Sequence, residues 1–209
     1  MKIVIIGASG HGKVAFDALK TMNGIAIAGF IDDAFEKQGK KILAVPVLGN
    51  IDFLMEELQE TIDGVFVAIG NNYIRKKITE RVSKQFTLVN AIHSKAIISE
   101  YASLGKGVLV VAGAIINSGS KISDGVIINT GATIDHDNFI GEYSHIAPGA
   151  HLAGNVTVGQ MTFIGMGSSI IQNVAIGSNV TIGAGSVVIK DLPDNCLAVG
   201  VPAKIKKRF

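Results

Sequence analysis

Hydrophobic residues in the first 94 positions alternate between two periods. Apolar runs of strand length recur four times, at residues 2–7, 25–31, 64–69 and 87–92. Between them, apolar residues recur at helical spacing over residues 11–22, 51–62 and 74–82. Strands separated by helices pair in parallel and are covered on both faces, which explains why these strands are almost continuously apolar. The sequence therefore predicts a small Rossmann-like parallel sheet over residues 1–94.

From Ile98 onward the helical period disappears and every sixth residue is aliphatic. The series has no failure: Ile98, Leu104, Val110, Ile116, Ile122, Ile128, Ile134, Ile140, Ile146, Leu152, Val158, Ile164, Ile170, Ile176, Ile182 and Val188. Four residues after most of these positions stand small or β-branched residues, whereas Asn138 has an amide side chain there. Such a period predicts a parallel β-helix over residues 95–190, with three hexapeptides to a coil. The fold class is then α/β plus all-β.

The ends of such a coil need caps, because each coil buries its apolar edge only against its neighbours. About five coils stacked ~4.8 Å apart would make a prism about 24 Å tall. We expect the first domain to cover one end and residues 191–209 to form a C-terminal cap or tail.

Composition and charge exclude several function classes. The net charge is only +2 with acidic and basic residues interspersed, so no nucleic-acid partner is expected. No stretch approaches the roughly 18 apolar residues needed to cross a bilayer, so we expect no membrane insertion. The chain starts directly with a strand, which favours a cytoplasmic protein. The single cysteine, Cys196, excludes an internal disulfide and a thiolate metal cluster.

Two segments of the first domain are suited to binding a nucleotide. The loop Gly7-Ala8-Ser9-Gly10-His11-Gly12 joins a strand to a helix, so its N–H groups and the helix N-terminus can hold a phosphate. Its glycines do not have the dinucleotide spacing. Asp32-Asp33 follows the second strand, where a carboxylate in such sheets usually meets a ribose, although a plain polar turn also fits.

His136 is the strongest candidate for acid–base chemistry. It stands two places after the inward Ile134, near a corner of the predicted prism, between Asp135 and Asp137. Imidazole has an ordinary pKa near 6.5, which suits a general base, and a neighbouring carboxylate can fix its tautomer. From the residues alone, a surface histidine in a polar turn remains an alternative.

Several motifs together resemble one family over nearly the whole chain. They are Gly7-Ala8-Ser9-Gly10-His11-Gly12, Ile69-Gly70-Asn71-Asn72, Asp135-His136-Asp137, His145 and Gly200-Val201-Pro202-Ala203-Lys204. The pattern resembles the left-handed β-helix acyltransferases, and in particular bacterial sugar acetyltransferases with an N-terminal nucleotide-sugar-binding domain. This group includes sialic acid O-acetyltransferases and UDP-4-amino-sugar N-acetyltransferases, such as the enzyme that makes UDP-di-N-acetylbacillosamine.

The resemblance implies a left-handed coil, acetyl-CoA as co-substrate, no metal, and a homotrimer with active sites between subunits. It implies catalytic roles for His136 and Asp137. Residues implied to bind the acceptor are Gly10, His11, Asp32, Asp33, Asn71 and Asn129. Residues implied to contact acetyl-CoA are His145, Gly154, Met166 and Ala184.

The expected reaction is direct acetyl transfer to the amino group of a UDP-4-amino-sugar of bacillosamine type, with His136 as general base. Direct transfer is favoured because Cys196 lies outside the coil and no serine–histidine arrangement is evident. The backbone N–H of Gly154 is a candidate donor to the oxyanion. Two alternatives remain: O-acetylation of sialic acid or a polysaccharide sugar, and a non-catalytic β-helix scaffold.

Overall fold

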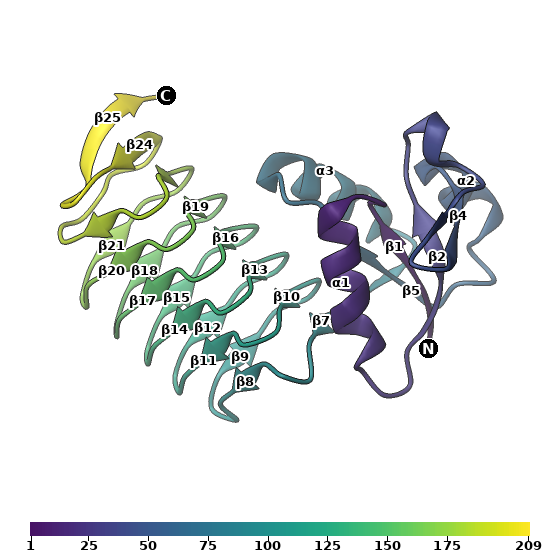
Figure 1. Ribbon diagram of the computed structural model, residues 1–209, viewed down its shortest axis with the longest axis horizontal. Coiled ribbons are helices and arrows are strands. Elements are labelled where there is room, and N and C mark those ends of the chain that lie inside the picture. Colours follow the sequence, from purple (N-terminus) through teal and green to yellow (C-terminus); the bar gives the residue numbers. More distant parts are fainter. The chain divides into compact units, whose positions relative to one another are not determined.

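A parallel sheet with helices between its strands makes up Met1–Ser94, the first of two compact units in this computed structural model of Met1–Phe209 (Figure 1). The strand order is β3-β4-β2-β1-β5-β6, and neighbours are parallel except β3 with β4. The predicted Rossmann-like sheet is confirmed. The elements are β1 (Lys2–Ile6), α1 (Gly10–Lys20), β2 (Ala26–Ile31), the 3₁₀ helix η1 (Phe35–Lys37), β3 (Lys41–Ile42), β4 (Val45–Gly49), α2 (Ile51–Glu57), β5 (Gly64–Val67), α3 (Asn72–Val82), β6 (Thr87–Leu88) and β7 (Ala91–Ile92).

Several elements differ from the sequence prediction. Strand β4 was not predicted, because Pro46 interrupts its short apolar run and proline usually argues against a strand. In the structure Pro46 pairs with Lys41 of the two-residue strand β3. Helix α2 ends at Glu57, about a turn before the apolar pattern stops, although Ile62 is still buried. The predicted strand over residues 87–92 is divided into β6 and β7.

Both faces of this sheet are covered by apolar side chains. On one face, Val4 and Ile6 of β1 pack in a buried cluster with Leu54 of α2 and Val82 of α3. Alternate residues of a strand point to opposite faces, so Ile3 and Ile5 face the other side, where α1 contacts β1 and β2. The central strands of the sheet are thus buried from both sides.

The second unit, Lys95–Phe209, is a left-handed parallel β-helix of two-residue strands (Figure 1). In every strand the second residue belongs to the predicted hexapeptide series, and from Val110 onward all of these residues are buried. The strands are β8 (Ile97–Ile98), β9 (Ser103–Leu104), β10 (Leu109–Val110), β11 (Ile115–Ile116), β12 (Lys121–Ile122), β13 (Ile127–Ile128), β14 (Thr133–Ile134), β15 (Phe139–Ile140), β16 (His145–Ile146), β17 (His151–Leu152), β18 (Thr157–Val158), β19 (Phe163–Ile164), β20 (Ser169–Ile170), β21 (Ala175–Ile176), β22 (Thr181–Ile182) and β23 (Val187–Val188).

These strands form the three faces of a triangular prism. Face A contains β10, β13, β16, β19 and β22; face B contains β8, β11, β14, β17, β20 and β23; face C contains β9, β12, β15, β18 and β21. The chain passes from face A to B to C and back, so it turns at corners AB, BC and CA. In a triangular prism each corner lies opposite the third face. Corner BC is therefore opposite face A.

One residue at each corner has a positive φ, and these residues repeat every 18 positions. They are Gly113, Gly131, Gly149, Gly167 and Gly185 at corner AB; Gly119, Asp137, Asn155 and Asn173 at corner BC; and Gly107, Gly125, Tyr143, Met161 and Asn179 at corner CA. Glycine, asparagine and aspartate adopt this conformation at the lowest cost, which explains most of these identities. Asp137 thus occupies a position where the turn itself favours a short polar side chain.

Residues after the coil close its end with a hairpin. Strand β24 (Cys196–Val199) pairs in parallel with β22, and β25 (Lys204–Arg208) pairs antiparallel with β24. The lysines and arginine of β25 are exposed along this outer strand, where charge opposes edge-to-edge association. The longest helices, α1 and α3, have 11 residues each, and none is long and apolar enough to span a membrane.

Candidate active site

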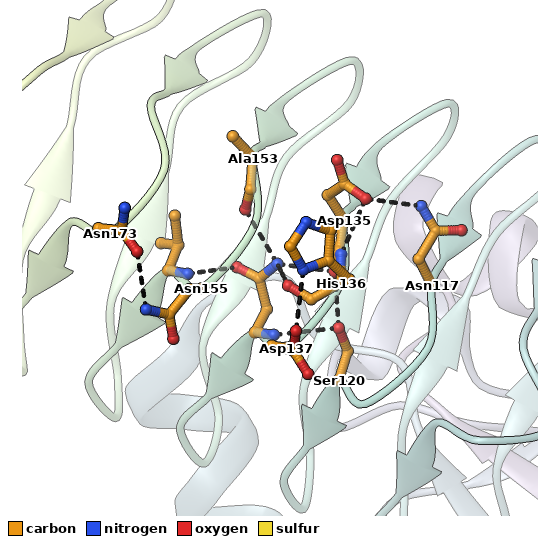
Figure 2. Close-up of polar contacts among 10 residues, drawn as sticks. Asn117, Ser120, Asp135, His136, Asp137, Ala153, Asn155 and Asn173 are labelled. Carbon is orange, nitrogen blue, oxygen red and sulfur yellow. Dashed lines mark hydrogen bonds and ion pairs between the residues drawn. The ribbon is translucent and has the colours of Figure 1, made fainter.

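His136 and Asp137 lie together at corner BC, where β14 leads into β15 (Figure 2). Oδ2 of Asp137 is 2.9 Å from Nδ1 of His136, so the carboxylate accepts the Nδ1 hydrogen and the lone pair stays on Nε2. Both side chains are open to solvent, with exposed fractions of 61% and 65%. The hydrogen bond to Asp137 raises the pKa of His136 above its ordinary value. This is the arrangement of an accessible base with a supporting carboxylate.

Asp135 fixes the backbone that carries the histidine. Its Oδ1 accepts a hydrogen bond from the His136 N–H at 2.8 Å and another from Nδ2 of Asn117 at 3.0 Å (Figure 2). The Asn117 bond first, and then the backbone bond, lower the pKa of Asp135, which keeps the group ionised. The imidazole is therefore bordered by two carboxylates with different roles.

Gly154, one coil further along, provides the space in which the imidazole lies. A Cβ atom built on Gly154 would lie 2.4 Å from both Cε1 and Nε2 of His136. Gly154 does not have a positive φ, so the turn itself does not require glycine here. The sequence pattern associated Gly154 with the cofactor. The structure places it against the ring of the candidate base.

A groove of about 380 Å³ lies on face B beside this corner. Asp135 lines it together with Asn117, Thr133, His151 and Ser169. Nδ1 of His151 is 2.9 Å from Oγ1 of Thr133, so these two polar groups hold each other in place. Sequence reasoning did not include this groove, because its lining residues come from four different coils.

Asn129 and His145 form a second pair, on face A. Nδ2 of Asn129 lies 3.0 Å from Nε2 of His145, so the amide donates and the hydrogen of this imidazole is on Nδ1. The ring is only 7% exposed and meets the Phe163 ring edge-on at 5.1 Å. His145 is thus held by two contacts, and both partners of the pair are residues that the family resemblance singled out.

The structure does not bring all of the predicted coil residues together in one chain. His136, Asp137 and Gly154 are at corner BC, whereas Asn129 and His145 are on the opposite face A. Met166 and Ala184 are at corner AB, each directly before a corner glycine. One chain therefore carries two separate groups of candidate residues. We call His136, Asp137 and Gly154 the BC group, and Asn129, His145, Met166 and Ala184 the A group.

In the first unit, the glycine loop lies at a topological switch point of the sheet. From β1 the chain continues to β2 and β4 on one side, whereas β5 and β6 lie on the other side. Ligands of such sheets bind in the crevice at the carboxyl ends of the strands where the order reverses. A Cβ on Gly7 would be 2.7 Å from the Ala68 carbonyl oxygen, so the loops after β1 and β5 are in contact there. Gly10 has open space around it.

His11, in the first turn of α1, is neutral. Burial, and secondarily the charge of Arg75, lower its pKa to about 4. It therefore contributes no positive charge to this crevice.

Arg75 of α3 is a functional candidate that sequence reasoning missed. Its side chain is 1% exposed, and Nη1 donates to the carbonyls of Ile69 at 2.9 Å and Gly70 at 3.2 Å. Nη2 donates to Oδ1 of Asn72 at 2.9 Å. Through these bonds the guanidinium holds the loop that follows β5 in place. The hydrophobic pattern did not single out Arg75, because arginine in a helix is usually exposed.

Asn71 and the two aspartates all have structural partners. Oδ1 of Asn71 accepts from the Ile74 N–H at 3.0 Å and caps α3. Asp32 accepts from the N–H of Ala8 at 2.7 Å, from the N–H of Ala34 and from Lys37. Partial burial by itself raises the pKa of Asp32, but these bonds outweigh it and the pKa is lowered. Asp32 thus holds the glycine loop in place through the Ala8 N–H.

Asp33 borders a second groove, of about 330 Å³. Its Oδ1 accepts from the Ile51 N–H at 3.0 Å. The groove has an aromatic ring, two cations and apolar walls: its lining residues are Asp33, Ile51, Tyr73, Ile74, Lys77, Ile78 and Arg81. No cluster of three or more histidine, cysteine or acidic side chains is arranged to hold a metal ion.

Comparison with known proteins agrees with both units of the fold. Residues 2–82 match the PglD N-terminal domain family, and residues 155–190 match the bacterial transferase hexapeptide (six repeats) family. The UDP-N-acetylbacillosamine N-acetyltransferase of Bacillus subtilis (strain 168) is 37% identical over 115 residues. That match spans 53% of this chain and 51% of the relative, about half the length of each.

Two solved structures match nearly the whole chain. PerB from Caulobacter crescentus, in complex with CoA and GDP-perosamine, is 43% identical with a TM-score of 0.93, over 99% of this chain and 98% of that one. The acetyltransferase domain of PglB from Neisseria gonorrhoeae FA1090 is 40% identical with a TM-score of 0.90, over 98% of each chain. This chain therefore belongs to the hexapeptide-repeat sugar N-acetyltransferases that carry a PglD N-terminal domain.

Proposed function

We propose that this protein transfers the acetyl group of acetyl-CoA to the amino group of a UDP-linked 4-amino sugar of bacillosamine type, with His136 as general base. The proposal rests on one observation: the exposed His136 ring is hydrogen-bonded to Asp137 at 2.9 Å and lies directly against Gly154. The names of the relatives support the substrate class. One acts on a UDP-linked sugar, and another was solved with CoA and GDP-perosamine.

The proposed chemistry is a direct transfer in which His136 moves one proton. The neutral amine attacks the thioester carbonyl, a C–N bond forms, and Nε2 of His136 takes the proton that the nitrogen loses. Asp137 stabilises the resulting imidazolium through Nδ1. The Gly154 N–H is the proposed donor to the oxyanion. When the C–S bond breaks, the CoA thiolate leaves and receives the proton from His136.

The separation of the BC group from the A group supports a site made by two copies of the chain. We propose a homotrimer in which corner BC of one copy faces face A and corner AB of its neighbour. His136 and Gly154 would then meet the neighbour's Asn129, His145, Met166 and Ala184 across the acetyl-CoA. Light scattering tests the assembly, which should have three times the 21.8 kDa mass of one chain. A monomer mass would contradict it.

For the nucleotide part of the acceptor, the switch-point crevice and the groove at Asp33 supply suitable chemistry. Loop N–H groups and the α1 N-terminus near Gly10 and His11 favour the diphosphate. Asp33 and the Tyr73 ring suit a ribose and a base. The relatives' names include both a UDP- and a GDP-linked sugar, so both nucleotides belong in the assay.

The decisive experiment is His136→Ala, assayed by release of the CoA thiol with a panel of UDP- and GDP-linked amino sugars. We expect kcat/KM to fall at least about 10²-fold, the usual contribution of a general base. Circular dichroism checks that the coil is intact. A value within about tenfold of wild type would remove His136 as the base. Transfer to a hydroxyl but not to an amine would support O-acetylation, and binding of neither substrate would support a scaffold.

A further inference from the structure

Asn138 occupies an unusual place inside corner BC. The coil points one side chain inward at this corner in each turn: Ala102, Ser120, Asn138, Val156 and Val174. Asn138 is the only amide among them, and it is 1% exposed. Since valine fills the same position in the next two coils, packing of the coil does not require a polar side chain here.

Buried hydroxyls elsewhere in the coil show what a polar side chain normally does inside a corner. Oγ1 of Thr162 donates to the Gly177 carbonyl at 2.8 Å and accepts from the Val180 N–H at 3.0 Å, which links one coil to the next. Asn138 makes the same link. Its Nδ2 donates to the Ala153 carbonyl at 3.0 Å, and its Oδ1 accepts from the Val156 N–H at 3.1 Å.

Asn138 also donates to two carbonyls of its own turn. Its Nδ2 donates to the carbonyl of Asp135 at 2.7 Å and to that of His136 at 3.2 Å, so its two hydrogens are shared among three carbonyls with that of Ala153. These carbonyls belong to the peptide groups on either side of the His136 Cα atom. Ser120 adds to the arrangement, because its Oγ donates to the Asp135 carbonyl at 2.6 Å and accepts from the Asn138 N–H at 3.2 Å.

We propose that Asn138 is a positioning residue of the transferase site, which holds both peptide groups that flank His136 and so keeps the imidazole between Asp137 and Gly154. The inference rests on the proposed function of His136. The imidazole is largely exposed, so its orientation depends on the backbone below it more than on packing around it. The buried amide cannot reach a substrate and acts only through this backbone.

The test compares Asn138→Ser with Thr162→Val. Serine, by analogy with Ser120, keeps the link between coils but is too short to reach the carbonyls of Asp135 and His136. We expect Asn138→Ser to lower kcat at least about tenfold with little change in the KM of either substrate. Thr162→Val loses the same kind of link at another corner, so it should lower the Tm and leave kcat at the wild-type value. Asn138→Val should combine both losses.

A second readout does not depend on activity. The imidazole of His136 can be titrated by NMR of ¹³C-labelled histidine, with the resonance identified from His136→Ala. Asp135 and Asp137 are the charged groups around it, and both remain in Asn138→Ser. If the turn is loosened, the hydrogen bond between Asp137 and His136 forms less of the time, so the pKa of His136 should move back toward 6.5.

The two readouts separate this inference from the proposed function. If Asn138→Ser has the kcat of wild type and an unchanged His136 titration, Asn138 only links coils and the inference is wrong. If wild type transfers no acetyl group, the proposed function fails. The titration still decides in that case whether Asn138 positions the ring.

Discussion

Gly154→Ala tests whether the surface beneath the His136 ring matters for catalysis. The substitution adds one methyl group, whose carbon would lie 2.4 Å from Cε1 and Nε2 and 3.0 Å from Nδ1. Ordinary contacts of a Cβ atom begin at 3.4 Å, so the ring must move away by about 1 Å. Gly154 does not have a positive φ, so alanine fits the backbone and the coil should remain folded.

A shift of this size is large for a general base. A displacement of about 1 Å at a reacting group costs on the order of 10²-fold in rate. We therefore expect kcat of Gly154→Ala to fall by about that factor, with both KM values close to wild type. Steady-state release of CoA measures kcat, and circular dichroism with thermal melting measures the fold.

The matched control for Gly154→Ala is the double variant His136→Ala/Gly154→Ala. If Gly154 acts by making room for the imidazole, it has no further effect once the imidazole is removed, and the double variant should equal His136→Ala. The reasoning is refuted if Gly154→Ala keeps kcat within about threefold of wild type. It is also refuted if the second substitution lowers the residual rate of His136→Ala by the full factor again.

Three further predictions follow from the same geometry. The logarithm of kcat/KM should rise with pH and level off above the raised pKa of His136. Asparagine also suits the left-handed turn, so Asp137→Asn should keep the fold, move this midpoint down toward 6.5 and lower the plateau about tenfold or more. Two variants, His136→Ala and His145→Ala, should each be inactive alone but partly active when their chains are co-assembled. A site between two copies can then contain both intact histidines. A mixture without activity would contradict the two-copy site. Arg75→Met should raise the KM for the nucleotide sugar at least about tenfold and leave the KM for acetyl-CoA unchanged, since it releases the Ile69 and Gly70 carbonyls of the crevice loop in the first unit only. Equal changes in both KM values would indicate general unfolding.

The separate roles of the carboxylates at corner BC explain why two aspartates flank the histidine. Asp135 accepts from the His136 backbone and from Asn117, so it orients the turn. Asp137 accepts from the ring, so it sets the tautomer and the basicity. Substituting either one perturbs the same imidazole through a different bond. Because the hydrogen bond to Asp137 is the largest cause of the raised pKa of His136, the variant at Asp137 should move the pH midpoint further than the variant at Asp135.

The hydrophobic pattern by itself determined the architecture. A six-residue period without interruption from Ile98 to Val188 can be buried only by a coil of three short strands per turn, and a strand–helix alternation before it can be buried only by a covered parallel sheet. The period also placed His136 at a corner. These features are local and repetitive, so each residue's neighbours follow from its distance along the chain.

Only the tertiary structure decided which side chains meet. The 18-residue stacking brings Gly154 against His136, and the direction of each side chain, which the period does not specify, turns the Asn138 amide toward the carbonyls of Asp135 and His136. The closing of the prism places His145 on the face opposite His136, although the two are near in sequence. Arg75 is buried because carbonyls of a loop accept its hydrogen bonds, a contact that no periodicity encodes. Sites depend on such directions across the fold, whereas the fold depends on the pattern along the chain.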